Sequence, residues 1–128
     1  MILGPAPARA LAPLALMGAI FYLSAQPSVG PDLPARTRIA AHITEYFVLA
    51  SLWIWALGPG LGRRALPVAA AISLLYAVSD EYHQSFVEGR ESDPLDVLAD
   101  AAGIAAACWL AQARGSTSTR ATHSRSRG

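Results

Sequence analysis

The chain has little charge and no lysine. Only 15% of its 128 residues are charged, against about 25% in ordinary soluble domains, and 53% are hydrophobic. All ten basic residues are arginines, which together with the abundant alanine is typical of a GC-rich bacterial genome. The single cysteine, Cys108, lies in an apolar run, so the chain has no internal disulfide and no cysteine-based metal motif. This composition makes a membrane protein the first class to test.

Other patterns are missing as well. No segment alternates polar and apolar residues as a strand does, and no internal repeat or phosphate-binding glycine loop is present. No activated Ser or Cys nucleophile is visible. Apart from a few arginines near the C-terminus, nothing favours nucleic acid, and we expect no nucleic-acid partner.

Four apolar segments are each near the length that crosses a membrane as a helix. Spanning the hydrocarbon takes about 20 residues, with about 17 as a minimum, and backbone groups in lipid must satisfy their hydrogen bonds internally. We therefore predict an all-α fold, a compact four-helix transmembrane bundle, in one domain of residues 1–113. The predicted helices cover about residues 9–25, 39–57, 65–86 and 94–113.

Proline, glycine and charge separate these segments. Residues 26–38 hold three prolines and a glycine and predict a loop, GPGLGRR at 58–64 predicts a tight turn between antiparallel helices, and 87–93 is a short charged link. Residues 114–128 are rich in Ser, Thr and Arg and predict a disordered cytoplasmic tail. The first segment could instead be a cleaved signal peptide, although its basic region is thin and LSA before Gln26 is a poor cleavage site.

Arginine placement predicts the orientation in the membrane. Segments on the cytoplasmic side carry an excess of Lys and Arg. The N-terminus, the 58–64 turn and the tail together hold seven arginines, whereas the other two connections with their helix ends hold three. We therefore expect a multi-pass protein of the bacterial cell membrane with both termini in the cytoplasm. All nine acidic residues then belong to its outer half.

Acidic residues of three helices fall at one predicted depth. With helix edges at residues 39, 86 and 94, Glu45, Asp80 and Asp100 each lie six residues, about 9 Å, inside the outer edge. The third helix is extended to residue 86 because a stop at 78 leaves the span too short. The extension also completes an apolar stripe at helical spacing, formed by Leu75, Val78, Tyr82 and Phe86.

Polar residues also share helix faces in this layer. Arg38, His42 and Glu45 follow i, i+4, i+7 spacing, and ionisable groups at membrane depth usually face the bundle interior, where they pair. We expect four of them, Glu45, Glu81, Gln84 and Asp100, to face one cavity with Arg90 near its mouth. The candidate polar site comprises His42, Glu45, Asp80, Glu81, Gln84, Arg90, Asp96 and Asp100.

Structural roles compete with a site role at the start of the fourth helix. Asp93 before Pro94 fits an N-cap with proline at the first helical position, and Asp96 lies near the positive end of the helix dipole. Asp100 lies a turn too deep for capping, which favours a site role. His42 could equally be an interfacial histidine with its hydrogen bonds satisfied.

The acids of the third helix have a competing explanation too. Asp80 and Glu81 could be a solvated helix end if that helix stopped at residue 78, and Arg90 could be only their counter-ion. Glu45 needs a partner in either case, since it lies inside an apolar helix.

Three motifs together resemble the VanZ-like family of bacterial membrane proteins. They are HITEY at 42–46, SDEYHQSFVEGR at 79–90 and LDVLADAAG at 95–103, and YLSAQP at 22–27 is similar as well. The resemblance covers about residues 10–112 and implies a small multi-pass protein, often of four helices. The family's named member is linked to resistance to glycopeptide antibiotics of the teicoplanin type. The family's recurrent polar residues fall on His42, Glu45, Glu81, Gln84, Arg90, Asp96, Asp100 and Gly103.

Two positions depart from the family pattern. Glu88 stands where the family often has proline before the Gly-Arg pair. Asp100 stands where it often has asparagine, so a charge there is not required by the resemblance.

Three classes of function remain open. The first is a binding or accessory protein whose partners are membrane lipids, such as a lipid-linked envelope precursor held by its headgroup. The second is an intramembrane enzyme acting on a polyprenyl-phosphate or similar lipid: Arg90 would hold phosphate, and Glu45 or Glu81 would be the general base, or carboxylates and His42 would bind a divalent cation. The third is a transporter or channel, which four short helices favour least unless they oligomerise.

Overall fold

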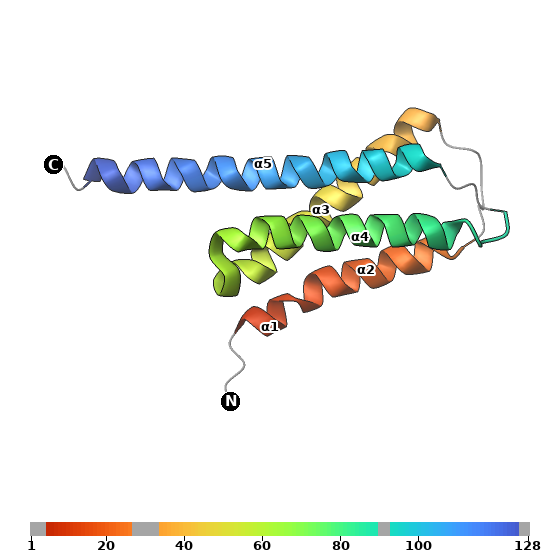
Figure 1. Ribbon diagram of the computed structural model, residues 1–128, viewed down its shortest axis with the longest axis horizontal. Coiled ribbons are helices and arrows are strands. Elements are labelled where there is room, and N and C mark those ends of the chain that lie inside the picture. The colour runs from red at the N-terminus through yellow and green to blue at the C-terminus, as the bar shows by residue number, and fades with distance from the viewer. Residues whose placement is uncertain (1–4, 27–33, 90–92, 126–128) are drawn as a thin grey trace.

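The protein is helical throughout the described part of the chain. The computed structural model describes residues 5–26, 34–89 and 93–125, with side-chain exposure for 7–26, 34–89 and 93–115. These residues contain no strand, which confirms the all-α prediction. The elements are α1 (Pro5–Arg9), α2 (Leu11–Ser24), α3 (Ala35–Leu61), the 3₁₀ turn η1 (Gly62–Arg64), α4 (Ala65–Gln84) and α5 (Pro94–Arg125) (Figure 1).

Three stretches of the described chain, not the predicted four, are long and apolar enough to cross a membrane. They are Pro7–Ser24, Ala35–Gln84 and Pro94–Gly115. The middle stretch has 50 residues because α3, η1 and α4 are consecutive helical elements with no residue between them. The chain nevertheless reverses direction at η1, so that α4 runs back along α3 (Figure 1). Gly62 permits this reversal, because its φ of 57° lies in a region that other residues rarely adopt.

The helix ends differ from the predicted ones in ways that local chemistry explains. Before α2 the helix is interrupted at Ala10, and α3 begins at Ala35, directly after Pro34 in extended conformation. α4 passes Val78 as predicted but ends at Gln84, because the amide groups of Phe86 and Val87 bond three residues back to His83 and Gln84 in successive turns. α5 continues to Arg125, whereas the sequence predicted a disordered tail from Arg114; no proline follows Pro94 to stop it.

The predicted turn at 58–64 is shorter in the structure, because α3 continues through Pro59 to Leu61. Proline has no amide hydrogen, so Pro59 cannot bond to the carbonyl of Trp55 four residues earlier. Arg9 compensates: its guanidinium donates to the Trp55 carbonyl oxygen at 3.3 Å and lies over the Trp55 ring, 4.8 Å from the centroid. The end of α1 is thereby attached to the end of α3.

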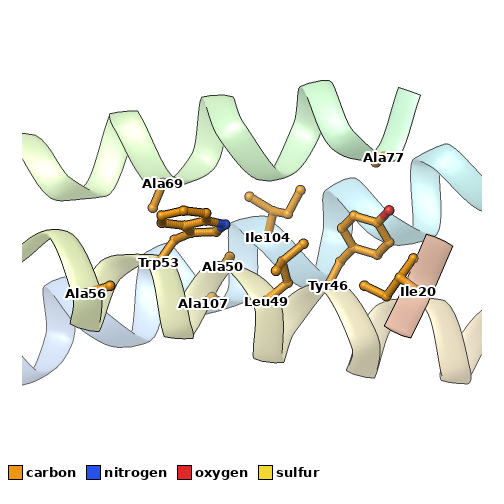
Figure 2. Close-up of a cluster of buried hydrophobic side chains, with 10 residues drawn as sticks. All are labelled: Ile20, Tyr46, Leu49, Ala50, Trp53, Ala56, Ala69, Ala77, Ile104 and Ala107. Atoms are coloured by element: carbon orange, nitrogen blue, oxygen red, sulfur yellow. The ribbon is translucent and has the colours of Figure 1, made fainter. Parts of the chain in front are cut away.

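Small residues form most of the helix contacts. α3 is central and packs against α5, α4 and α2. Seven of the twelve buried hydrophobic residues described are alanines, which let helix backbones approach closely, as membrane helices do. Figure 2 shows Tyr46 and Trp53 reaching from α3 toward α4, where Ala77 and Ala69 face them.

The predicted apolar stripe of α4 faces away from the bundle. Leu75 and Phe86 are both 71% exposed, and Val78 and Tyr82 are exposed as well. Such a surface of large apolar side chains suits contact with lipid tails. The stripe therefore marks the outer face of α4, and the polar residues Asp80 and Gln84 occupy its buried face.

α3 and α5 touch through their backbones at Gly103. A Cβ atom at this position would lie 2.2 Å from the carbonyl oxygen of Ile43 and 2.9 Å from the amide nitrogen of Phe47. No side chain fits such a space, so glycine is required for the two helices to cross at this distance.

We expect Gly103→Ala to lower the free energy of unfolding by about 1–3 kcal/mol, because the added methyl group meets backbone that cannot move aside. Unfolding of the purified protein in mixed micelles, followed by circular dichroism, measures this change. Gly18→Ala is the matched control, since a Cβ atom there meets nothing within 4 Å. Equal stability of the two variants would contradict the close contact.

Candidate functional site

A histidine of α3 lies between two buried aspartates of α5. The His42 Nδ1 atom lies 2.8 Å from Asp100 Oδ1, a hydrogen bond, and His42 Nε2 lies 3.8 Å from Asp96 Oδ2. The side chains of Asp96 and Asp100 are each 4% exposed and that of His42 is 15% exposed. Two carboxylates removed from water at this depth need such a partner, because an unpaired buried charge is costly.

Arg38 extends this arrangement to the surface. Its Nη2 atom donates to Asp93 Oδ2 at 3.3 Å, and its Nε atom lies 3.4 Å from Asp96 Oδ1. The Arg38 side chain is 41% exposed and that of Asp93 is 33% exposed. These five residues, here named the His42 network, form a continuous path of polar groups from the surface to the interior: Arg38, Asp93, Asp96, His42 and Asp100.

Helical spacing on two facing helices creates the network. Arg38 and His42 are one turn apart on α3, and Asp93, Asp96 and Asp100 follow i, i+3, i+7 spacing along α5. Asp93 also caps α5, as predicted, since its Oδ1 atom accepts from the Leu95 amide at 3.0 Å. Asp93 therefore has the predicted capping role and also binds Arg38, because each of its oxygens accepts from a different donor.

A second polar cluster joins α4 to α2. The Gln84 Nε2 atom donates to Asp80 Oδ2 at 3.3 Å and to Ser24 Oγ at 3.2 Å. All three residues are buried, with exposures of 2%, 6% and 3%. The Tyr76 hydroxyl adds a further link by donating to the carbonyl oxygen of Met17.

The structure therefore sorts the candidate residues into groups. His42, Asp96 and Asp100 lie in the His42 network, and Asp80 and Gln84 lie in the second cluster. Glu45 and Glu81 are half-buried, and Glu45 interacts electrostatically with His42. Arg90 lies outside the described residues. One cavity shared by Glu45, Glu81, Gln84 and Asp100 stays a prediction.

Tyr46 stands between the two groups. Its side chain is fully buried, and its hydroxyl interacts electrostatically with Asp80, Asp100 and Glu45. The hydroxyl has no hydrogen-bond partner among the described residues. Tyr46 is not among the predicted site residues; its place one turn after His42 on α3 was the sequence feature that could have indicated it.

A divalent-cation site was one of the predictions for the carboxylates and His42. Among the described residues, no group of three or more His, Cys, Asp or Glu side chains is arranged to hold a metal ion. His42 directs both ring nitrogens toward carboxylates of α5. The described arrangement suits proton sharing and hydrogen bonding.

Apolar helices with buried ionisable pairs define a helical membrane protein. The chain belongs to the VanZ/LLP1 family, whose model matches residues 10–114. That match confirms the family resemblance seen in the motifs. No curated protein and no solved structure matches the chain.

We expect His42→Ala to lower the free energy of unfolding by about 3–5 kcal/mol, because it leaves Asp100 buried without its partner and Asp96 with Arg38 alone. The loss is measured by unfolding in mixed micelles. Asp100→Asn is the matched control: its amide oxygen still accepts from His42 Nδ1, so we expect a loss of about 1 kcal/mol or less. A loss as large as that of His42→Ala would show that the charge of Asp100 and not its acceptor oxygen holds His42.

Proposed function

We propose that this VanZ-family protein crosses the bacterial cell membrane four times, with both termini in the cytoplasm, and binds the headgroup of an envelope lipid in its His42 network. The four crossings follow from dividing the 50-residue stretch at η1, because α3 and α4 run in opposite directions (Figure 1). The 27 residues of α3 and the 20 of α4 are each long enough to span about 30 Å of hydrocarbon.

The orientation rests on the separation of charge. No acidic residue occurs between Glu45 and Asp80 or after Asp100, so the half of the bundle that contains η1 carries arginine only. Arginine-rich ends face the cytoplasm. The His42 network then opens to the outer side.

The observation that carries the headgroup proposal is the gradient of exposure along the His42 network, from 41% at Arg38 to 4% at Asp100. A purely structural ion pair needs no path to the surface. Arg38 at the open end suits a phosphate oxygen, and the aspartates accept hydrogen bonds from hydroxyl or ammonium groups. A lipid-linked envelope precursor combines both kinds of group, and occupancy of such a lipid would connect the protein to glycopeptide resistance.

One observation favours an enzyme as the second candidate. Asp100 orients His42 through Nδ1 at 2.8 Å, which is how a carboxylate positions a histidine general base. His42 would then take a proton from a hydroxyl or water attacking a polyprenyl-phosphate lipid. Incubating the protein in nanodiscs with radiolabelled polyprenyl-phosphate lipid separates the candidates: an enzyme forms product that His42→Gln abolishes, whereas a binding protein retains the lipid unchanged.

The orientation predicts the pattern of cysteine labelling in intact cells. In a Cys108→Ser background, we expect an impermeant maleimide to label a cysteine that replaces Glu88, outside, and to spare one that replaces Ser116, inside. Permeabilised cells serve as the control, since both positions should then react. The reverse pattern in intact cells would overturn the orientation.

The site predicts the effect of near-isosteric variants in a susceptible bacterium that expresses the protein. We expect His42→Gln and Glu45→Gln to reduce resistance to a teicoplanin-type glycopeptide to the level of the empty vector, with unchanged protein abundance, because the first removes the central residue of the network and the second removes a carboxylate that interacts electrostatically with it. Glu88→Gln is the control, since Glu88 is an exposed acid outside the His42 network. Full resistance of both site variants at normal abundance would exclude a role of the network, and loss of abundance would assign it to stability.

A further inference from the structure

A groove lies between α3 and α5 at the arginine-rich half of the bundle, away from the His42 network. Its volume is about 200 Å³, and its walls include Ile54, Trp55, Ala107, Leu110, Ala111 and Arg114. Typical ligand pockets have roughly 300–1,000 Å³. The groove therefore admits a slender apolar segment, such as part of one acyl chain, and not a compact drug-sized molecule.

Two arginines from distant parts of the chain stand beside this groove. Arg114 of α5 belongs to its lining and is exposed. Arg9 of α1 is held against Trp55, another lining residue, by the carbonyl hydrogen bond and by stacking over the ring. The Trp55 side chain is itself 48% exposed, as is usual for a tryptophan at the boundary between lipid tails and headgroups.

The arginines have no acidic neighbour on the chain segments that form this half of the bundle. The nearest acids in sequence to Trp55 are Glu45 and Asp80, and none follows Asp100 on α5. Glu45, Asp80 and Asp100 all belong to the opposite half of the bundle. A largely apolar groove with one arginine in its lining and a second against a lining residue is complementary to a molecule with an apolar chain and an anionic headgroup.

We propose that this groove is a binding site for an anionic phospholipid, with one acyl chain between α3 and α5 and the phosphodiester at Arg114 and Arg9. The site is separate from the proposed headgroup site of the His42 network and depends only on insertion of the bundle in a membrane. The guanidinium groups contact the phosphate, and the site prefers a lipid of net negative charge because no choline ammonium then lies beside that phosphate and repels the arginines; the apolar walls orient the chain.

Binding is tested with phosphatidylglycerol and phosphatidylcholine of identical acyl chains, added to the full-length protein in detergent and counted as bound lipid by native mass spectrometry. We expect phosphatidylglycerol to bind more tightly. Arg114→Gln should weaken it roughly tenfold through loss of a charge-assisted contact. Ala111→Phe should weaken it similarly by filling the groove while leaving every charge in place.

Arg63→Gln is the matched control, because it removes one arginine from the same half of the bundle but not from the groove lining. Its affinity for phosphatidylglycerol should equal that of the wild type, and circular dichroism confirms that each variant remains helical. An equal loss in Arg63→Gln and Arg114→Gln would overturn the site in favour of general attraction to basic charge. Equal binding of the two lipids by the wild type, or undiminished binding by Ala111→Phe, would overturn it too.

Discussion

The backbone contact between α3 and α5 at Gly103 sets the distances on which the polar interior depends. A side chain here would have to occupy the space of the Ile43 carbonyl, so the helices approach as closely as their backbones allow. His42 directly precedes Ile43, and Asp100 lies three residues before Gly103, so a short spacing between the helices at this crossing brings the short Asp100 side chain within 2.8 Å of the imidazole. Gly103 contacts none of the polar atoms, but it permits the helix spacing at which they come within hydrogen-bond distance.

The ion pairs between α3 and α5 matter more for stability in a lipid bilayer than they would in water. A surface ion pair in a soluble protein contributes little, because water screens and replaces it. Asp96 and Asp100 have no such alternative when the helices lie in a bilayer, so they depend on His42 and Arg38 for hydrogen bonds and counter-charge. The same reasoning applies to Asp80, which shares the Gln84 amide with Ser24. Each of these buried acids therefore has a hydrogen-bond or ion-pair partner: the partners of Asp96 and Asp100 lie on α3, and that of Asp80 lies on its own helix.

Much of the fold followed from residue patterns, because apolar length and helical periodicity are local properties. The continuation of α4 past Val78 and the capping of α5 by Asp93 were both predicted in this way. Contacts between helices are not local: the sequence placed Glu45, Asp80 and Asp100 at one depth but did not indicate that Gln84 links Asp80 to Ser24 of α2 while Asp100 bonds to His42 of α3. Arg38 was recognised on the correct face, yet its contact with Asp93 depends on the helix crossing, which no single segment encodes.

The alanine-rich interior has a consequence for the register of the helices. Large interdigitating side chains prevent two helices from sliding along each other, because the ridges of one helix fit into the grooves of the other. Alanine side chains form only shallow ridges and resist such a shift less. Seven alanines among the buried hydrophobic residues described leave few such large side chains. Polar pairs at defined heights, His42 with Asp100 and Arg38 with Asp93, then fix the register, since a shift by one turn would separate both pairs. The charged groups that are most costly to bury in a bilayer thus also determine the register of α5 along α3.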